Sequence, residues 1–132
     1  MSKGKKTITV SLDTAANPPV TVCPRDLVLK ERGTFKVRWS RDEYSPEFVF
    51  ESLTIDGETF TNPTSEKSPG NGGPFKDISV SDDRIQLKDE VDSAATSPYE
   101  YEITVKVGDD IYSTGSVEIR LLTKRPTIRN EA

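Results

Sequence analysis

The chain of 132 residues carries 22 acidic and 18 basic side chains, a formal net charge of −4, and has one cysteine and no histidine. This length suits a single domain that buries a core without disulfide or metal staples. The charge balance argues against a nucleic-acid-binding module, and the lack of histidine excludes Ser-His-Asp and Cys-His catalysis and the usual zinc sites.

Strict alternation of apolar and polar residues predicts β-strands along the first half of the chain. In the segment 35–39, Phe35, Val37 and Trp39 alternate with polar residues. One face of this strand should therefore be buried, with Trp39 in the core. The same pattern predicts strands at 7–12, 20–22 and 27–29.

The segment 48–60 departs from simple alternation, because its apolar residues fall on both parities. A bulge near Glu51–Ser52, or a strand that is apolar on both faces, would account for this. Asp56-Gly57 is a strong signal for a two-residue hairpin turn that returns the chain through 58–60.

Residues 61–77 contain three prolines and three glycines and predict a long loop. Loops of this length are uncommon in compact domains, so the segment is expected to be either a mobile crossing between sheets or a partner-binding loop.

In the second half, alternation predicts short strands at 78–80 and 85–87 around a turn, a long strand at 99–107, and further strands at 111–112 and 117–121. No segment shows the period of a helix. The predicted fold is a single all-β domain over residues 1–132, a two-sheet antiparallel Greek-key β-sandwich of eight or nine strands with no substantial helix. The ends, 1–6 and 123–132, are expected to be flexible.

Two segments carry a resemblance to known β-sandwich families. Residues 20–50, VTVCPRDLVLKERGTFKVRWSRDEYSPEFVF, resemble the first half of a cupredoxin, and YEYEITVKVGDDIYSTGSVEI, which begins at Tyr99, is similar in outline to its last hairpin. The same outline resembles immunoglobulin-like sandwiches and small uncharacterised bacterial proteins with a Y-x-Y-x-I-x-V strand. The resemblance implies a sandwich of one of these types.

The copper chemistry of a cupredoxin does not carry over to this chain. A blue-copper site needs two imidazoles and a thiolate. Glu47 and Phe48 stand near the expected place of the first histidine, and Ile103 and Val105 follow Tyr101. We therefore expect no copper site and no cofactor.

Aromatic residues outside the predicted core are the candidate contacts of a site. Tyr44 lies in a polar loop, Phe48 follows that loop, and Phe75 ends the long segment 61–77. These three are the candidate contacts to a partner or ligand. The aspartates of the predicted turns, such as Asp82-Asp83, lack the spacing of an EF-hand loop, and turn aspartates are common for local hydrogen bonding.

The function expected from the sequence is that of a non-enzymatic β-sandwich interaction or structural module. The alternative is a carbohydrate- or small-ligand-binding domain, possibly assisted by calcium. The expected partner is an unknown protein or a carbohydrate, and neither nucleic acid nor membrane. No apolar stretch follows the N-terminal lysines as in a signal peptide, so a cytoplasmic location is expected.

Overall fold

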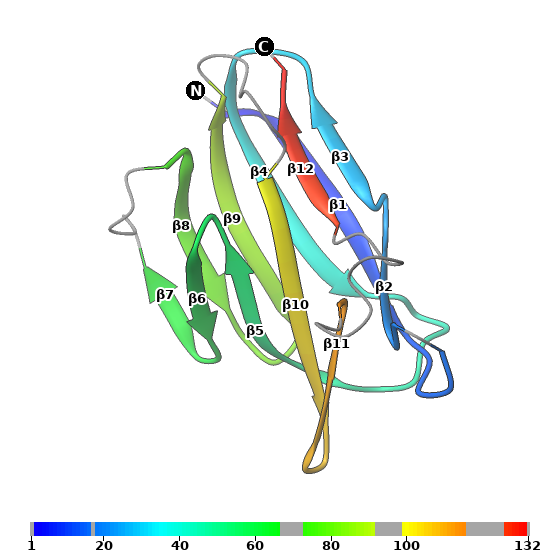
Figure 1. The fold of residues 1–132 in the computed structure, drawn as a ribbon. Coiled ribbons are helices and arrows are strands. Elements are labelled where there is room, and N and C mark those ends of the chain that lie inside the picture. The colour runs from blue at the N-terminus through cyan, green and yellow to red at the C-terminus, as the bar shows by residue number, and fades with distance from the viewer. Residues whose placement is uncertain (1, 17, 67–72, 92–98, 116–125, 132) are drawn as a thin grey trace.

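The computed structural model describes residues 2–16, 18–66, 73–91, 99–115 and 126–131 as two packed β-sheets (Figure 1). The all-β, two-sheet prediction is confirmed, but the described residues contain twelve strands rather than eight or nine. The strands are β1 (Ser2–Leu12), β2 (Val20–Cys23), β3 (Asp26–Leu29), β4 (Gly33–Arg41), β5 (Val49–Ile55), β6 (Glu58–Thr61), β7 (Thr64–Glu66), β8 (Phe75–Val80), β9 (Arg84–Val91), β10 (Tyr99–Val107), β11 (Asp110–Ser113) and β12 (Thr127–Asn130). Among the described residues, no helix is long and apolar enough to cross a membrane.

The first sheet has the strand order β2-β1-β4-β9-β8-β7. The neighbours β1 and β4 run parallel with Ile8 beside Trp39, whereas all other neighbouring strands of this sheet are antiparallel. Parallel neighbours need a crossover connection, and the chain provides one by passing through β2 and β3 before it returns as β4. The sheet is therefore mixed, not purely antiparallel as predicted.

The second sheet has the order β3-β12-β10-β5-β6, and β11 also pairs with β10. One half of β10 pairs with β12 at Tyr99 and Glu100, and the other half pairs with β11 from Thr104 to Val107. β3 and β12 are parallel, so this sheet is mixed as well. The hairpin of β10 and β11 projects from the end of the sandwich opposite the two chain termini (Figure 1).

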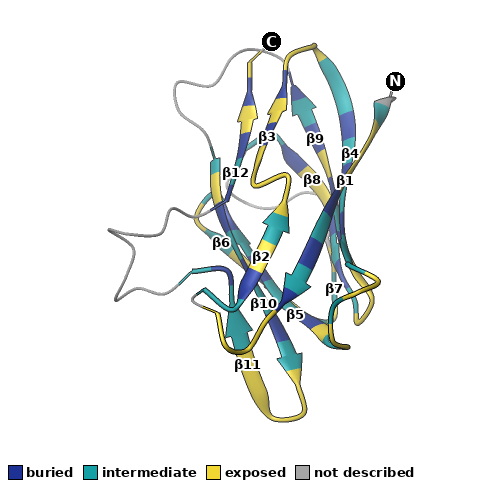
Figure 2. Ribbon diagram, turned by 90° about the vertical axis from the view of Figure 1, so that its right-hand side faces the viewer, coloured by how far each residue is buried: buried dark blue, intermediate teal, exposed yellow. Residues whose placement is uncertain are grey.

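The core lies between the sheets and follows from the alternation along each strand. Figure 2 shows buried residues in bands that alternate with more exposed ones along β1 and β4. Trp39 is fully buried, as predicted, and its ring meets that of Tyr101 from the facing sheet edge-to-face at a centroid distance of 5.3 Å. Aromatic pairs favour this arrangement.

Two local predictions for the segment 48–60 are confirmed. The register between β5 and β10 shifts where Phe50 and Ser52 oppose consecutive residues, which places the bulge at Glu51. β5 and β6 pair around a turn in which Asp56 and Gly57 have φ values of 51° and 80°. A type I′ turn requires positive φ at both positions.

The flexible ends predicted from the sequence are wrong for the residues that the structure describes. Residues 2–6 belong to β1 and pair with β4, and residues 127–130 form β12 between β3 and β10. Ile128 is fully buried there. Pairing with β3 and β10 holds this short strand in place, since the stability of a strand depends mainly on its packing against neighbours.

The long loop predicted at 61–77 is also partly wrong. Residues 64–66 form β7, which pairs with β8, and Phe75 begins β8. Residues 67–72 lie outside the described residues, as does the strand predicted at 117–121.

Candidate functional site

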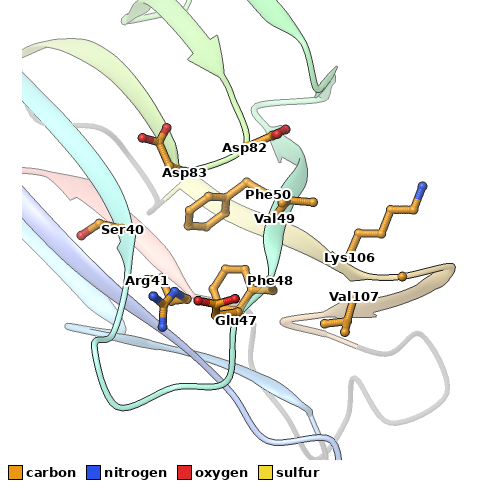
Figure 3. A pocket seen from close by; sticks show the side chains of 11 residues that line it. Ser40, Arg41, Glu47, Phe48, Val49, Phe50, Asp82, Asp83, Lys106 and Val107 are labelled. Atoms are coloured by element: carbon orange, nitrogen blue, oxygen red, sulfur yellow. The ribbon is translucent and has the colours of Figure 1, made fainter.

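An open groove of about 770 Å³ lies at the end of the sandwich where β4, β5, β9 and β10 begin or end (Figure 3). We call it the end groove. Its volume falls within the range of ligand-binding pockets in proteins. Its lining residues are Ser40, Arg41, Glu47, Phe48, Val49, Phe50, Asp82, Asp83, Lys106, Val107 and Gly108.

Apolar side chains form the middle of the end groove. The rings of Phe48 and Phe50 meet edge-to-face at 5.3 Å, so that buried Phe50 supports half-buried Phe48. Val49 and Val107 remain 36% and 40% exposed, although both are large apolar side chains. The groove therefore offers a partner apolar area that burial would remove from water.

The loop between β4 and β5 frames one side of the end groove through hydrogen bonds to its own backbone. The guanidinium of Arg41 donates to the carbonyl oxygen of Ser45 at 2.9 Å. The carboxylate of Asp42 accepts from Ser11 Oγ at 3.2 Å and from the backbone N–H of Tyr44 at 3.0 Å. The loop is thus tied both to itself and to β1 while Tyr44 stays 89% exposed.

The turn between β8 and β9 frames the opposite side. The backbone N–H of Phe50 donates to the carbonyl oxygen of Asp82 at 3.0 Å. The amide of Asn62 donates to Asp82 Oδ1 at 2.8 Å and to the carbonyl oxygen of Phe50 at 2.9 Å. These contacts connect the turn to β5 across the groove wall, so both rims are set before any partner arrives.

The charged side chains of the end groove have both signs. Arg41 and Lys106 are cationic, and Glu47, Asp82 and Asp83 are anionic. In Figure 3, the two aspartates lie on one side and Lys106 on another, with the phenyl rings between them. Within the described residues, no group of three or more histidine, cysteine or acidic side chains is placed to hold a metal ion. The groove suits a ligand with apolar and charged groups of both signs.

The three candidate contacts predicted from the sequence lie in different places in the structure. Phe48 lines the end groove, and Tyr44 is exposed on the loop that frames it. Phe75 instead belongs to the core, because it is only 3% exposed and packs edge-to-face on Tyr99 at 5.0 Å. The apolar end of a loop anchors the chain there rather than facing a partner.

Sequence reasoning did not identify the contributions of Arg41, Lys106 and Val107 to the groove. Lys106 and Val107 end the most regular strand of the chain, and their parity assigns them only to a strand face. One sequence signal could have indicated a role for Val107: an apolar residue just before the Gly108 turn is expected to be exposed.

A separate polar pair lies in the core, away from the end groove. Asp89 on β9 and Asn130 on β12 are 0% and 3% exposed, and Asn130 Nδ2 donates to Asp89 Oδ1 at 2.9 Å. Burial raises the pKa of the Asp89 carboxyl to about 6, although the hydrogen bond from Asn130 opposes the shift. Burial also raises the pKa of the Tyr99 hydroxyl, and the negative charges of Asp56 and Asp89 add to that shift.

No protein family matches the chain, and no curated protein matches it.

Proposed function

We propose that the chain is a non-enzymatic interaction module that holds an extended segment of a partner protein in the end groove. The observation that carries this proposal is the apolar strip of half-buried Phe48 and exposed Val49 and Val107 between two fixed rims. Binding sites commonly combine an apolar lining with a few polar groups that orient the ligand. Tyr44, on the ordered loop beside the groove, supplies an aromatic side chain of the kind enriched in interfaces.

A further exposed apolar side chain, that of Ile111, extends this surface along the outer face of the second sheet. Lys106 pairs with Val49 on one side and with Ile111 on the other, so the three form a row across β5, β10 and β11. Ile111 is 57% exposed. A partner segment that follows this row would bury apolar area on both sides of a cation.

The test is a selection of peptides from a random display library, followed by affinity measurement on the chain. Selected peptides should lose at least tenfold in affinity with Phe48→Ala, because the variant removes the ring between the rims. Val28→Ala is the matched control, since Val28 is 39% exposed on β3, outside the residues that line the end groove. Peptides that bind both variants equally would contradict the end groove as the site.

We further infer that the sandwich is of the immunoglobulin-like type. In that type, strands A, B, E and D form one sheet and C, F and G form the other. The strands β2, β4, β9 and β8 of the first sheet and β5, β10 and β12 of the second correspond to these sets, with β1 inserted between β2 and β4 and with β3, β6 and β7 added at the sheet edges. An experimental structure with a different assignment of these strands to the two sheets would overturn this inference.

The alternative function, carbohydrate or small-ligand binding, is favoured by an observation on a different surface. That surface is the outer face of the first sheet, where lysines of four neighbouring strands are paired side by side.

A further inference from the structure

Four lysines stand side by side across four neighbouring strands of the first sheet. Lys5 on β1 pairs with Lys36 on β4, Lys36 pairs with Lys88 on β9, and Lys88 pairs with Lys76 on β8. We call them the lysine row. Directly paired residues share a face of the sheet, and neighbouring strands lie about 4.8 Å apart, so the row is about 14 Å long.

The lysine row lies on the outer face, because the residues beside Lys36 and Lys88 along their strands point inward. Phe35 and Val37 flank Lys36, and Leu87 and Asp89 flank Lys88, and all four are buried. Lys5, Lys76 and Lys88 are exposed and Lys36 is partly exposed. The row is therefore a feature of the surface.

Like charges directly opposite one another destabilise a sheet, and this row is only half compensated. Lys76 Nζ lies 3.0 Å from Glu90 Oε1, and Lys88 Nζ lies 3.1 Å from Asp77 Oδ2. Both ion pairs are exposed to solvent, where such pairs contribute little. Among the described residues, Lys5 and Lys36 form no ion pair.

The adjacent positions add further positive charge and hydrogen-bonding groups. The next row contains Thr7, Arg38, Gln86 and Ser79. Arg38 donates through Nε and Nη2 to Gln86 Oε1 at 3.1 and 2.9 Å, and this partner is neutral, so the positive charge of Arg38 remains uncompensated. Arg84 lies one row further, opposite Ser40.

The described outer face of the first sheet therefore carries six cations and, with Asp42 hydrogen-bonded to Ser11 at its edge, three carboxylates, in a chain whose net charge is −4. The excess of three positive charges on this face is opposite in sign to the charge of the whole chain. Such a local field attracts anionic ligands.

The described outer face of the first sheet has no exposed large apolar side chain, and this limits the class of ligand that it can bind. The large apolar side chains exposed within the described residues are Val28, Val49, Val107 and Ile111, all on strands of the second sheet, and Tyr44 in a loop. Single-stranded nucleic acids bind through stacking on aromatic rings, and peripheral membrane binding relies on apolar insertion. The lysine row offers neither aromatic rings for stacking nor apolar side chains for insertion into a membrane. The row is also only one residue wide.

We propose that the outer face of the first sheet binds an acidic polysaccharide, with its carboxylate or sulfate groups aligned along the lysine row. Lys5 and Lys36 form the principal ion pairs because they have no carboxylate partner. Thr7 and Gln86, in the adjacent row, face the sugar hydroxyls. A single polysaccharide chain can lie along the row of cations. A broad anionic surface would also be repelled by the negative charge elsewhere on the molecule.

The experiment measures binding of the full chain to heparin, as a sulfated probe, and to alginate, as a carboxylated one. The double variant Lys5→Gln/Lys36→Gln should bind at least tenfold more weakly, and Lys5→Arg/Lys36→Arg should keep its binding. The charge-matched control Lys106→Gln/Arg129→Gln removes two cations from strands of the second sheet and should stay within twofold of the parent chain. Binding should also weaken as salt rises from about 50 to 200 mM, because salt screens ion pairs.

Three results would overturn the proposal: no binding of either polysaccharide at low salt, equal losses in the row variant and its control, or loss of binding in the arginine variant. Tighter binding of a single-stranded oligonucleotide or of phosphatidylserine vesicles would overturn the ligand class. The ratio of heparin to alginate affinity identifies sulfate or carboxylate as the recognised group. Circular dichroism of each variant verifies that it is folded, and Phe48→Ala should bind polysaccharide as well as the parent chain, which separates this face from the end groove.

Discussion

Asn130 and Asp89 form a buried hydrogen bond of 2.9 Å between strands of opposite sheets, and each keeps one oxygen without a partner among the described residues. The two remaining atoms, Asp89 Oδ2 and Asn130 Oδ1, are both acceptors when the carboxyl is ionised. A proton on the carboxyl provides the missing donor. The pair therefore favours the protonated form of Asp89.

We expect this pair to make the free energy of unfolding depend on pH. The pKa of Asp89 is about 6 in the folded chain against an ordinary value of 3.8. Because the folded pKa is the higher one, the fold binds the proton more tightly, and stability is lost as pH rises from about 4 to 6. The loss is about 3 kcal/mol at neutral pH.

Asp89→Asn tests this expectation because it mimics the protonated carboxyl. The variant should be more stable than the parent chain at pH 7, and the difference should shrink towards pH 4, as measured by urea unfolding at several pH values. Asp109→Asn removes the same charge at an exposed site and should change stability by less than about 0.5 kcal/mol. A difference for Asp89→Asn that does not vary with pH would show that Asp89 does not titrate in this range.

Trp39 should contribute more to stability than any exposed aromatic residue. Its ring is fully buried against Tyr101, so Trp39→Ala should lower the free energy of unfolding by about 3–5 kcal/mol. Tyr44→Ala is the control, since Tyr44 is 89% exposed and should cost less than about 0.5 kcal/mol. Denaturant titrations followed by circular dichroism measure both. Similar losses in the two variants would place Trp39 outside the core.

β12 should be an integral part of the second sheet. Ile128 is fully buried between neighbours, so Ile128→Ala should cost about 2–5 kcal/mol. Arg129, the next residue, is exposed, and its side chain forms an exposed ion pair with Glu131 at 3.6 Å, so Arg129→Ala should be nearly neutral. Thermal unfolding compares the two, and an equal effect would mean that β12 is not docked in solution.

The β5–β6 hairpin should depend on the conformation of Gly57 and not on space around it. Its φ is 80°, and a Cβ added there would meet nothing within 4 Å. Gly57→Ala should therefore cost about 1–2 kcal/mol, because only the left-handed backbone is unfavourable. Gly57→Asn should cost less, since asparagine tolerates this region better. If urea unfolding shows that Gly57→Asn is less stable than Gly57→Ala, the positive φ assigned to Gly57 in this turn is contradicted.

Regular alternation and turn residues made much of the fold predictable. β10 and the Asp56-Gly57 hairpin follow from local sequence alone, as does the bulge at Glu51. β12 was missed because its four residues stand in a basic segment, and only pairing with β3 and β10 orders them. The parallel pairs were missed because remote neighbours leave no trace in the local pattern.

The candidate sites were less predictable, because each is assembled from distant strands. Phe48 was identified as a candidate, but the rest of the end groove comes from the ends of strands that meet only in the fold. Lys5, Lys36, Lys76 and Lys88 are separated in sequence by acidic and apolar residues, and only the strand order aligns them. Asp89 was not identified as a buried residue, although its parity places it with Ile85 and Leu87 inside.

The parallel pairing of β3 with β12 also bears on the speed and hazards of folding. Asp26 and Thr127, which share a 2.8 Å side-chain hydrogen bond, are 101 residues apart in the chain. Contacts between such remote segments form late, since the entropy of closing the intervening chain must be lost first, and folds rich in them reach the native state in milliseconds to seconds. Until β12 arrives, β3 and one half of β10 present unpaired backbone donors and acceptors. Refolding at high concentration should therefore compete with association between chains through these open edges.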